Sequence, residues 1–266
     1  MIDIAAAVKL LRADGYNLAQ ARAKVAHDVV LAAIKRAGMK DKITIKGGVV
    51  MSSLTKSSRR ATMDMDVDLV HYSLSDHAIQ SLIKKLNGAS DCTIEIYGEI
   101  KELRQQEYRG KRVFLLVTDA RGAKAITKVD LGVHTKMEVK QKNLSFDLVA
   151  DERSVKLLAN SKEQIFVEKL KSMLRLGTLS SRYKDVYDMY YLMASIKKPT
   201  LRRYIEIYIY QDHSMRERNP EQIASRLEAI FSNRQFLANL RKKKFAWIDG
   251  ETAQDATSAI IKYLAI

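Results

Sequence analysis

Cysteine, proline and long hydrophobic runs are all scarce in this chain of 266 residues. The single cysteine, Cys92, excludes an intramolecular disulfide and argues against a cysteine-based metal site. No apolar run approaches the roughly 20 residues that span a bilayer. Because the first residues also lack a basic stretch ahead of an apolar core, we expect no secretory signal and no membrane partner. The cytoplasm is the expected compartment.

Acidic residues are too few to balance the basic ones. The chain has 46 Lys and Arg residues and 31 Asp and Glu residues, which gives a formal net charge of +15 at pH 7. This excess runs through both halves of the chain rather than one tail. Basic charge spread over a surface indicates contact with a polyanion, so RNA or another nucleic acid is the expected partner. A basic surface that only keeps the protein soluble is the alternative, because charge alone specifies no ligand.

The two prolines, Pro199 and Pro220, both fall where one predicted helix ends and the next begins. Strand patterns dominate before residues 150–160 and helical patterns after them, so we predict an α+β chain with a mixed-sheet core over 1–155 and a helical domain over 156–266. The predicted strands are 43–46, 64–70, 93–100, 112–117 and 125–133, and the predicted helices are 18–37, 49–55, 75–86, 161–176, 182–196, 200–210, 220–231, 233–243 and 252–264.

Two glycines and two aspartates at short spacing form the most informative stretch. Gly47 and Gly48 stand between a predicted strand and a predicted helix, where backbone N–H groups and the helix dipole favour an anion. Asp64 and Asp66 are two residues apart in the next strand, so both carboxylates project from one face. Paired carboxylates suit Mg²⁺, which is commonly held by one or two carboxylates plus substrate phosphates. The pattern predicts metal-assisted chemistry on a nucleoside triphosphate.

Each of these features also has a structural explanation. A Gly-Gly pair commonly forms a tight turn, and surface aspartates can simply pair with the neighbouring Arg59 and Arg60. The five histidines show no spacing typical of metal ligands, and we assign them no role.

The same residues resemble the motifs of the AbiEii-type nucleotidyltransferase toxins, a family of the DNA polymerase β-like nucleotidyltransferase superfamily. Gly47-Gly48 with Ser52 is similar to the first motif, and the segment Arg60-x-Thr62-x-Asp64-x-Asp66 is similar to the second. Glu168-Lys169-Leu170 and the block from Arg182 to Leu192 resemble the third. The similarity runs from about residue 20 to about residue 195 and implies a polymerase-β-like core.

The resemblance implies a third carboxylate on a neighbouring strand. Asp130 is the best candidate, because Val129 and Leu131 fall on the opposite face and repeat the pattern around Asp66. Asp119 is the second candidate, although it adjoins a turn that contains glycine. Asp64, Asp66 and Asp130 would then hold two Mg²⁺ ions. Asp68 shares their face but lies further from the glycines, and we expect a structural role for it.

By the same resemblance, the triphosphate would be held by Gly47, Gly48, Ser52 and Lys169. Asp185 would belong to the active site, although its position at the start of a predicted helix is also explained by the helix dipole. A lysine in a helix is likewise often only a solvated charge, so the assignment of Lys169 depends on the family motif.

These residues predict a Mg²⁺-dependent nucleotidyltransferase that moves a nucleoside monophosphate from an NTP to an RNA acceptor, with tRNA as the leading candidate. The resemblance implies a toxin of a bacterial toxin–antitoxin or phage-defence system, with a separately encoded antitoxin protein as partner. Two alternatives stay open: a small-molecule, antibiotic-type nucleotidyltransferase, and a non-catalytic RNA-binding module on the same fold.

Overall fold

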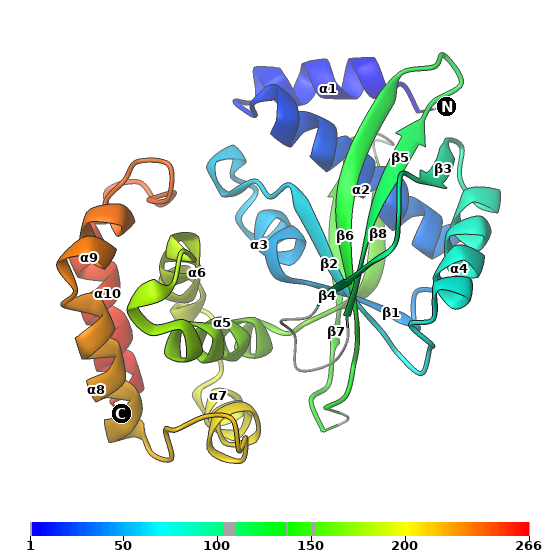
Figure 1. The fold of residues 1–266 in the computed structure, drawn as a ribbon. Helices are drawn as coiled ribbons and strands as arrows, with labels where there is room; N and C mark the ends of the chain where they lie inside the picture. The colour runs from blue at the N-terminus through cyan, green and yellow to red at the C-terminus, as the bar shows by residue number, and fades with distance from the viewer. Residues whose placement is uncertain (1, 104–109, 137, 150–152, 266) are drawn as a thin grey trace. The chain divides into compact units, whose positions relative to one another are not determined.

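The chain divides into two compact units, residues 1–160 and 161–266. The structure is a computed structural model, and it describes residues 2–103, 110–136, 138–149 and 153–265. The first unit combines one sheet with helices, and the second is helical (Figure 1). This arrangement confirms the predicted α+β class. Within the described ranges, no helix has both the length and the apolar character needed to cross a membrane.

The first unit is built around a mixed sheet, whose eight strands in the described residues follow the order β3-β5-β6-β2-β1-β8-β7, with β4 paired to β5. Two pairings are parallel, β2 with β6 and β1 with β8, and the others are antiparallel. The strands are β1 Ile43–Lys46, β2 Asp64–Leu69, β3 Thr93–Ile96, β4 Lys101–Leu103, β5 Gly110–Thr118, β6 Lys124–Val133, β7 Lys142–Leu148 and β8 Arg153–Ala159.

Helix α2 builds the core of this unit by packing on β5, β6, β7 and β8. It starts with a capping box, in which Asn17 accepts from the Gln20 N–H while the Gln20 side chain accepts from the Asn17 N–H. Helix α1 packs on α2, and α4 packs on β3 and α2. The helices of the unit are α1 Ile4–Ala13, α2 Leu18–Arg36, α3 Gly47–Thr55 and α4 Asp76–Gly88, with a 3₁₀ turn, η1, at Ser58–Arg60.

Strand β2 shows why the sheet has two different faces. Met65 and Val67 are buried, while Asp64 and Asp66, which alternate with them, are half-buried. Alternation of this kind places apolar side chains in the core and carboxylates on the other face. The packing of the strand thereby orients its aspartates.

The second unit is a set of packed helices. Helix α5 contacts α6 and α7, and α10 contacts α6 and α8. Phe166, Tyr187 and Phe236 are fully buried in its core, and the Tyr187 hydroxyl donates to the Leu240 carbonyl at 3.3 Å. The elements are α5 Lys162–Leu176, η2 Gly177–Leu179, α6 Tyr183–Met193, α7 Lys198–Ile205, a π-helical turn η3 Glu206–Tyr210, α8 Pro220–Phe231, α9 Arg234–Leu240 and α10 Ala253–Leu264.

The helix ends of this unit follow local chemistry. Ser161 caps α5 by accepting from the Gln164 N–H. Pro199 and Pro220 lie in the first turns of α7 and α8, where a missing N–H costs no intrahelical bond. The prediction that both prolines mark helix junctions is confirmed.

Among the described α-helices and β-strands, α1, β4, β7 and β8 were not predicted from the sequence. In β7 and β8 charged or polar residues alternate with apolar ones, and many side chains are exposed. Strand β8 also pairs with β1, whose residues lie more than a hundred positions earlier. Such a pairing is decided by tertiary contacts rather than by local propensity. The strand predicted over 93–100 is shorter, because β3 ends at Ile96.

Replacing Met65 by Ala is expected to lower the free energy of unfolding by about 2–5 kcal/mol, since the side chain is 0% exposed and its removal leaves a cavity. Met63 in the same segment is 50% exposed, so Met63→Ala should cost less than about 0.5 kcal/mol. Urea unfolding of both variants measures the difference. Equal losses would contradict the assignment of Met65 to the core.

Candidate active site

Three carboxylates come together on adjacent strands of the first unit. Strands β2 and β6 are parallel, and their register places Asp66 directly beside Asp130 and Asp64 beside Lys128. Directly paired residues project from the same face of a sheet, so Asp64, Asp66 and Asp130 share the face opposite the buried Met65. The structure thus brings all three predicted carboxylates together.

Basic side chains from neighbouring positions of the sheet pair with Asp130 and Asp64. Arg112 on β5 stands opposite Asp130 and donates to both of its oxygens, from Nε to Oδ1 at 2.7 Å and from Nη2 to Oδ2 at 2.8 Å. Lys128 Nζ lies 2.8 Å from Asp64 Oδ2. The hydrogen bond to Asp130, with the charges of Asp130, Asp64 and Asp66, raises the pKa of Arg112. The guanidinium therefore lies in the field of all three carboxylates.

In this arrangement, in which both ion pairs are formed, the described residues include no group of three Asp, Glu, His or Cys side chains placed to hold a metal ion. Sequence reasoning missed both Arg112 and Lys128. A signal was present for Lys128, which lies two residues before Asp130 on the same predicted strand and therefore shares its face. Only the pairing of β5 with β6 identifies the partner of Arg112.

Gly47 lies against Asp66 and opens helix α3. Its φ of +55° is in the left-handed region, and a Cβ added to it would lie 2.5 Å from Asp66 Oδ2. A Cβ on Gly48 would similarly lie 2.5 Å from Thr62 Oγ1. A side chain at Gly48 would therefore collide with Thr62, and one at Gly47 would have to displace the carboxylate of Asp66. The helix starts at Gly47 itself, so its N-terminal N–H groups, which have no intrahelical acceptor, begin beside the carboxylate.

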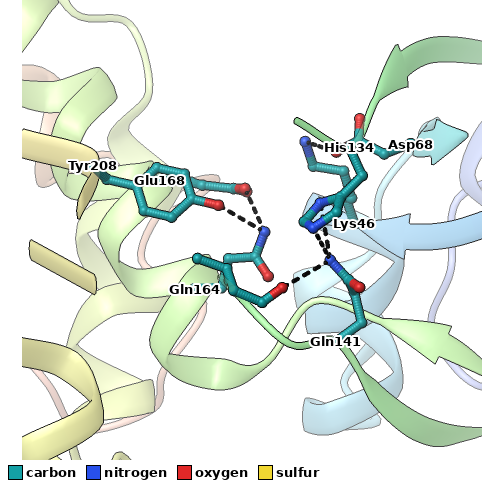
Figure 2. Close-up of polar contacts among 8 residues, drawn as sticks. Lys46, Asp68, His134, Gln141, Gln164, Glu168 and Tyr208 are labelled. Atoms are coloured by element: carbon teal, nitrogen blue, oxygen red, sulfur yellow. Dashed lines mark hydrogen bonds and ion pairs between the residues drawn. The ribbon is translucent and has the colours of Figure 1, made fainter. Parts of the chain in front are cut away.

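Asp68 continues the same face of β2 but is buried and ion-paired. Lys46 Nζ lies 2.8 Å from Asp68 Oδ2, and Figure 2 shows this pair together with the contact of His134 and Gln141 in the same unit. A buried carboxylate with a lysine partner fits the structural role expected for Asp68.

Asp119 occupies a different part of the sheet. Its carboxylate accepts from the backbone N–H groups of Ile4, Arg121 and Ala123, each at 2.9 Å. Because Asp119 precedes the start of β6, the rise of about 3.3 Å per residue places it roughly 20 Å from Asp130. These hydrogen bonds connect the β5–β6 turn to α1, so they give Asp119 a structural role.

Ser52 lies on α3, where its side chain is hydrogen-bonded with that of Tyr16. It lines a cavity rather than the face that carries Asp64 and Asp66. Contact with a triphosphate would require that bond to open.

The second unit contains its own buried charge cluster. Lys169 on α5 pairs with Asp185 and, at 2.8 Å, with Asp188 Oδ2. Trp247 Nε1 donates to Asp188 Oδ1 at 3.1 Å, and Arg182 Nη1 lies 3.8 Å from Asp185 Oδ2. The structure thus brings the predicted Lys169 and Asp185 together and adds Asp188 to them.

Close to Lys169 along α5, a polar network holds Gln164. Its amide nitrogen donates to Glu168 Oε1 at 3.0 Å and contacts the Tyr208 hydroxyl at 3.1 Å, as Figure 2 shows. Tyr208 belongs to the π-helical turn η3. Turns of this kind occur frequently at functional sites, and here the turn supplies a polar side chain to the helix that carries Lys169.

Comparison with known proteins places these motifs in one family. The family model described as "Nucleotidyl transferase AbiEii toxin, Type IV TA system" matches residues 29–257. No curated protein matches the chain. Among solved structures, an antigenic nucleotidyltransferase-like protein from Paracoccidioides brasiliensis is 16% identical, with 82% of this chain and 91% of that chain covered and a TM-score of 0.45. That likeness is too remote to bear on activity.

Gly47→Ala is expected to destabilise the protein more than Gly122→Ala. Both glycines have positive φ, at +55° and +84°, so each substitution carries a left-handed penalty of about 1–2 kcal/mol. Only at Gly47 does the added Cβ meet a carboxylate, whereas nothing lies within 4 Å of it at Gly122. Urea midpoints of the two variants test this, and indistinguishable midpoints would contradict the close approach of Asp66.

Proposed function

The chain belongs to the AbiEii family of nucleotidyltransferase toxins of type IV toxin–antitoxin systems, and we propose that it transfers a nucleoside monophosphate from an NTP to an RNA acceptor, with tRNA as the leading candidate. The observation that carries the proposal is the register of Asp66 with Asp130 on parallel strands, beside the glycines that open α3. Carboxylates next to a helix N-terminus are what a metal–triphosphate complex needs.

Asp64, Asp66 and Asp130 would hold the divalent metal, with two Mg²⁺ ions expected. Carboxylate oxygens are the ligands that Mg²⁺ prefers, so the donor set fits the ion. When bound, Mg²⁺ would polarise the phosphoryl oxygens and offset their charge. Metal binding would replace the ion pairs of Asp130 with Arg112 and of Asp64 with Lys128.

The chain's own groups would position the reactants. The N–H groups of Gly47 and Gly48 at the start of α3 would bind phosphate oxygens. Arg112 and Lys128, once released, would neutralise charge on the phosphates. The acceptor hydroxyl would attack the α-phosphorus and lose its proton, while the bond to the bridging oxygen breaks and pyrophosphate leaves. Lys169 is proposed as a catalytic and phosphate-binding residue, Asp185 as a further catalytic residue, and Ser52 as a further triphosphate contact.

The net charge of +15 supports RNA as the acceptor, since a small molecule gives no reason for a basic surface of this extent. Membership of a type IV toxin–antitoxin family implies a separate antitoxin protein. We propose the cytoplasm as the compartment in which the toxin meets its RNA.

The proposed reaction is tested by label transfer from each α-³²P nucleoside triphosphate, with Mg²⁺, onto total bacterial RNA. Asp66→Asn should reduce labelling by at least about 100-fold, because it removes a charge that stabilises the transition state. Asp91→Asn is the matched control, since Asp91 is an exposed partner of Arg36. Full labelling by Asp66→Asn would refute the metal assignment. Label that appears only on a small-molecule acceptor, independent of salt, would instead favour the antibiotic-type alternative.

Arg112→Gln is expected to tighten divalent metal binding several-fold, because Asp130 would no longer be held by a competing cation. Mn²⁺ titration followed by electron paramagnetic resonance measures this without any reaction. The control is Arg36→Gln, which removes an ion pair remote in sequence from the three carboxylates. Unchanged or weaker Mn²⁺ binding in Arg112→Gln would show that the guanidinium does not compete with the metal.

A further inference from the structure

A cavity of about 550 Å³ lies within the first unit. His27 of α2, Ser52 of α3 and Phe146 of β7 contribute to its walls. Cavities of about 300–1,000 Å³ are typical of sites for small molecules and cofactors. Of the residues proposed to hold the metal or the phosphates, Ser52 lines this space, and the rest of its lining has no part in that proposal.

Thr62 connects the cavity to strand β2, which carries Asp64 and Asp66. Thr62 lines the cavity, and its hydroxyl donates to the Asp64 carbonyl at 3.2 Å. The same hydroxyl lies so close to Gly48 that a Cβ there would collide with it. A ligand in the cavity would therefore lie next to the residues proposed to hold metal and phosphate.

Charges around the cavity are balanced. Lys24 pairs with Asp28, and Lys56 lies 2.8 Å from Asp147. Arg59 and Asp14 are the other charged residues of the lining, so it contains three cationic and three anionic side chains. A triphosphate would require a clear positive excess, so the lining favours the uncharged part of a ligand.

His27 is a buried and neutral residue of the wall. Its side chain is 2% exposed, and Nε2 has no hydrogen-bond partner in the described part of the chain. The ring donates to the Met63 carbonyl, so Nδ1 carries the proton. Burial, together with the charge of Lys24, lowers the pKa of His27 to about 3, so the imidazole stays neutral and Nε2 stays an acceptor. Because Nε2 is itself buried, His27 contributes a neutral ring and no charge to the wall.

The remaining lining suits a flat ring attached to a sugar. Tyr16, which is half-buried, offers aromatic surface on which a heteroaromatic ring can stack. Hydroxyl groups gather in the segment after Ser52, where Ser53, Ser57 and Ser58 also line the cavity. Hydroxyls both donate and accept, as do the hydroxyls of ribose.

We propose that this cavity binds a nucleoside, base and ribose together, that belongs to one of the two substrates of the transfer reaction. The inference rests on the proposed function, because it takes the neighbouring carboxylates as the reacting centre. Both the NTP and the 3′-terminal residue of the RNA acceptor carry this chemistry.

Binding of adenosine, guanosine, cytidine and uridine to the full chain, followed by ligand-observed NMR without metal, tests the cavity. At least one nucleoside should bind, and Ser53→Trp and Ser57→Trp should each weaken its binding at least tenfold by filling the cavity. Ser81→Trp is the matched control, since Ser81 is an exposed serine on α4 outside the lining. Urea midpoints verify that each variant is folded. The proposal is overturned if no nucleoside binds at millimolar concentration, or if both folded cavity variants bind as tightly as the control.

Displacement then identifies the source of the nucleoside. Displacement by an RNA oligonucleotide with a free 3′ hydroxyl assigns the cavity to the acceptor, and displacement by an NTP assigns it to the donor. If neither displaces the bound nucleoside, the link to the substrates is refuted. Because nucleoside binding needs neither metal nor transfer, a chain that binds nucleosides but labels no RNA would refute the proposed function and leave the cavity assignment standing.

Discussion

The parallel pairing of β2 with β6 is the constraint on which the candidate site depends. Its register sets Asp66 beside Asp130, and the alternation of each strand turns both side chains to the face opposite the core. A slip of one residue would bury carboxylates and expose Met65, so the apolar residues of β2 enforce the arrangement of its acidic ones. The packing energy of the sheet thereby maintains a cluster of like charges that would otherwise separate.

Electrostatic repulsion within that cluster is offset by cations from neighbouring strands. Arg112 holds Asp130, Lys128 holds Asp64 and Lys46 holds Asp68. The second unit has the opposite arrangement, in which one lysine, Lys169, pairs with two carboxylates. Loss of one partner from such a buried group leaves a charge uncompensated, which is far more costly than loss of an exposed pair. These ion pairs therefore hold the carboxylates in place in the structure.

Much of the architecture could be predicted from local patterns. Alternation identified β1, β2, β5 and β6 closely enough to choose Asp130, because parity alone shows which face a residue of a strand takes. The strands β7 and β8 escaped prediction, since half-exposed strands mix charged and apolar residues and β8 finds its parallel partner far away in the chain. Helix propensity and capping identified α5 and the two proline-marked helices, whose ends depend on neighbouring residues alone. Ser52 shows the limit of motif reasoning: the motif supplies a residue type, whereas the rotation of α3 directs its hydroxyl toward Tyr16.

By itself, the sequence determined the α+β class, the membership of a nucleotidyltransferase family and the identity of the acidic and glycine residues that form the candidate site. The class follows from periodicity along the chain, whereas the family and the site residues follow from the resemblance of short motifs to those of known proteins. Tertiary structure alone decided that Arg112 and Lys128 hold the carboxylates, that Gly47 lies against Asp66, that Asp188 joins Lys169, and that a charge-balanced cavity lies behind Thr62. The physical reason is that these contacts join residues on different strands and helices, and their partners are set by sheet register and helix packing.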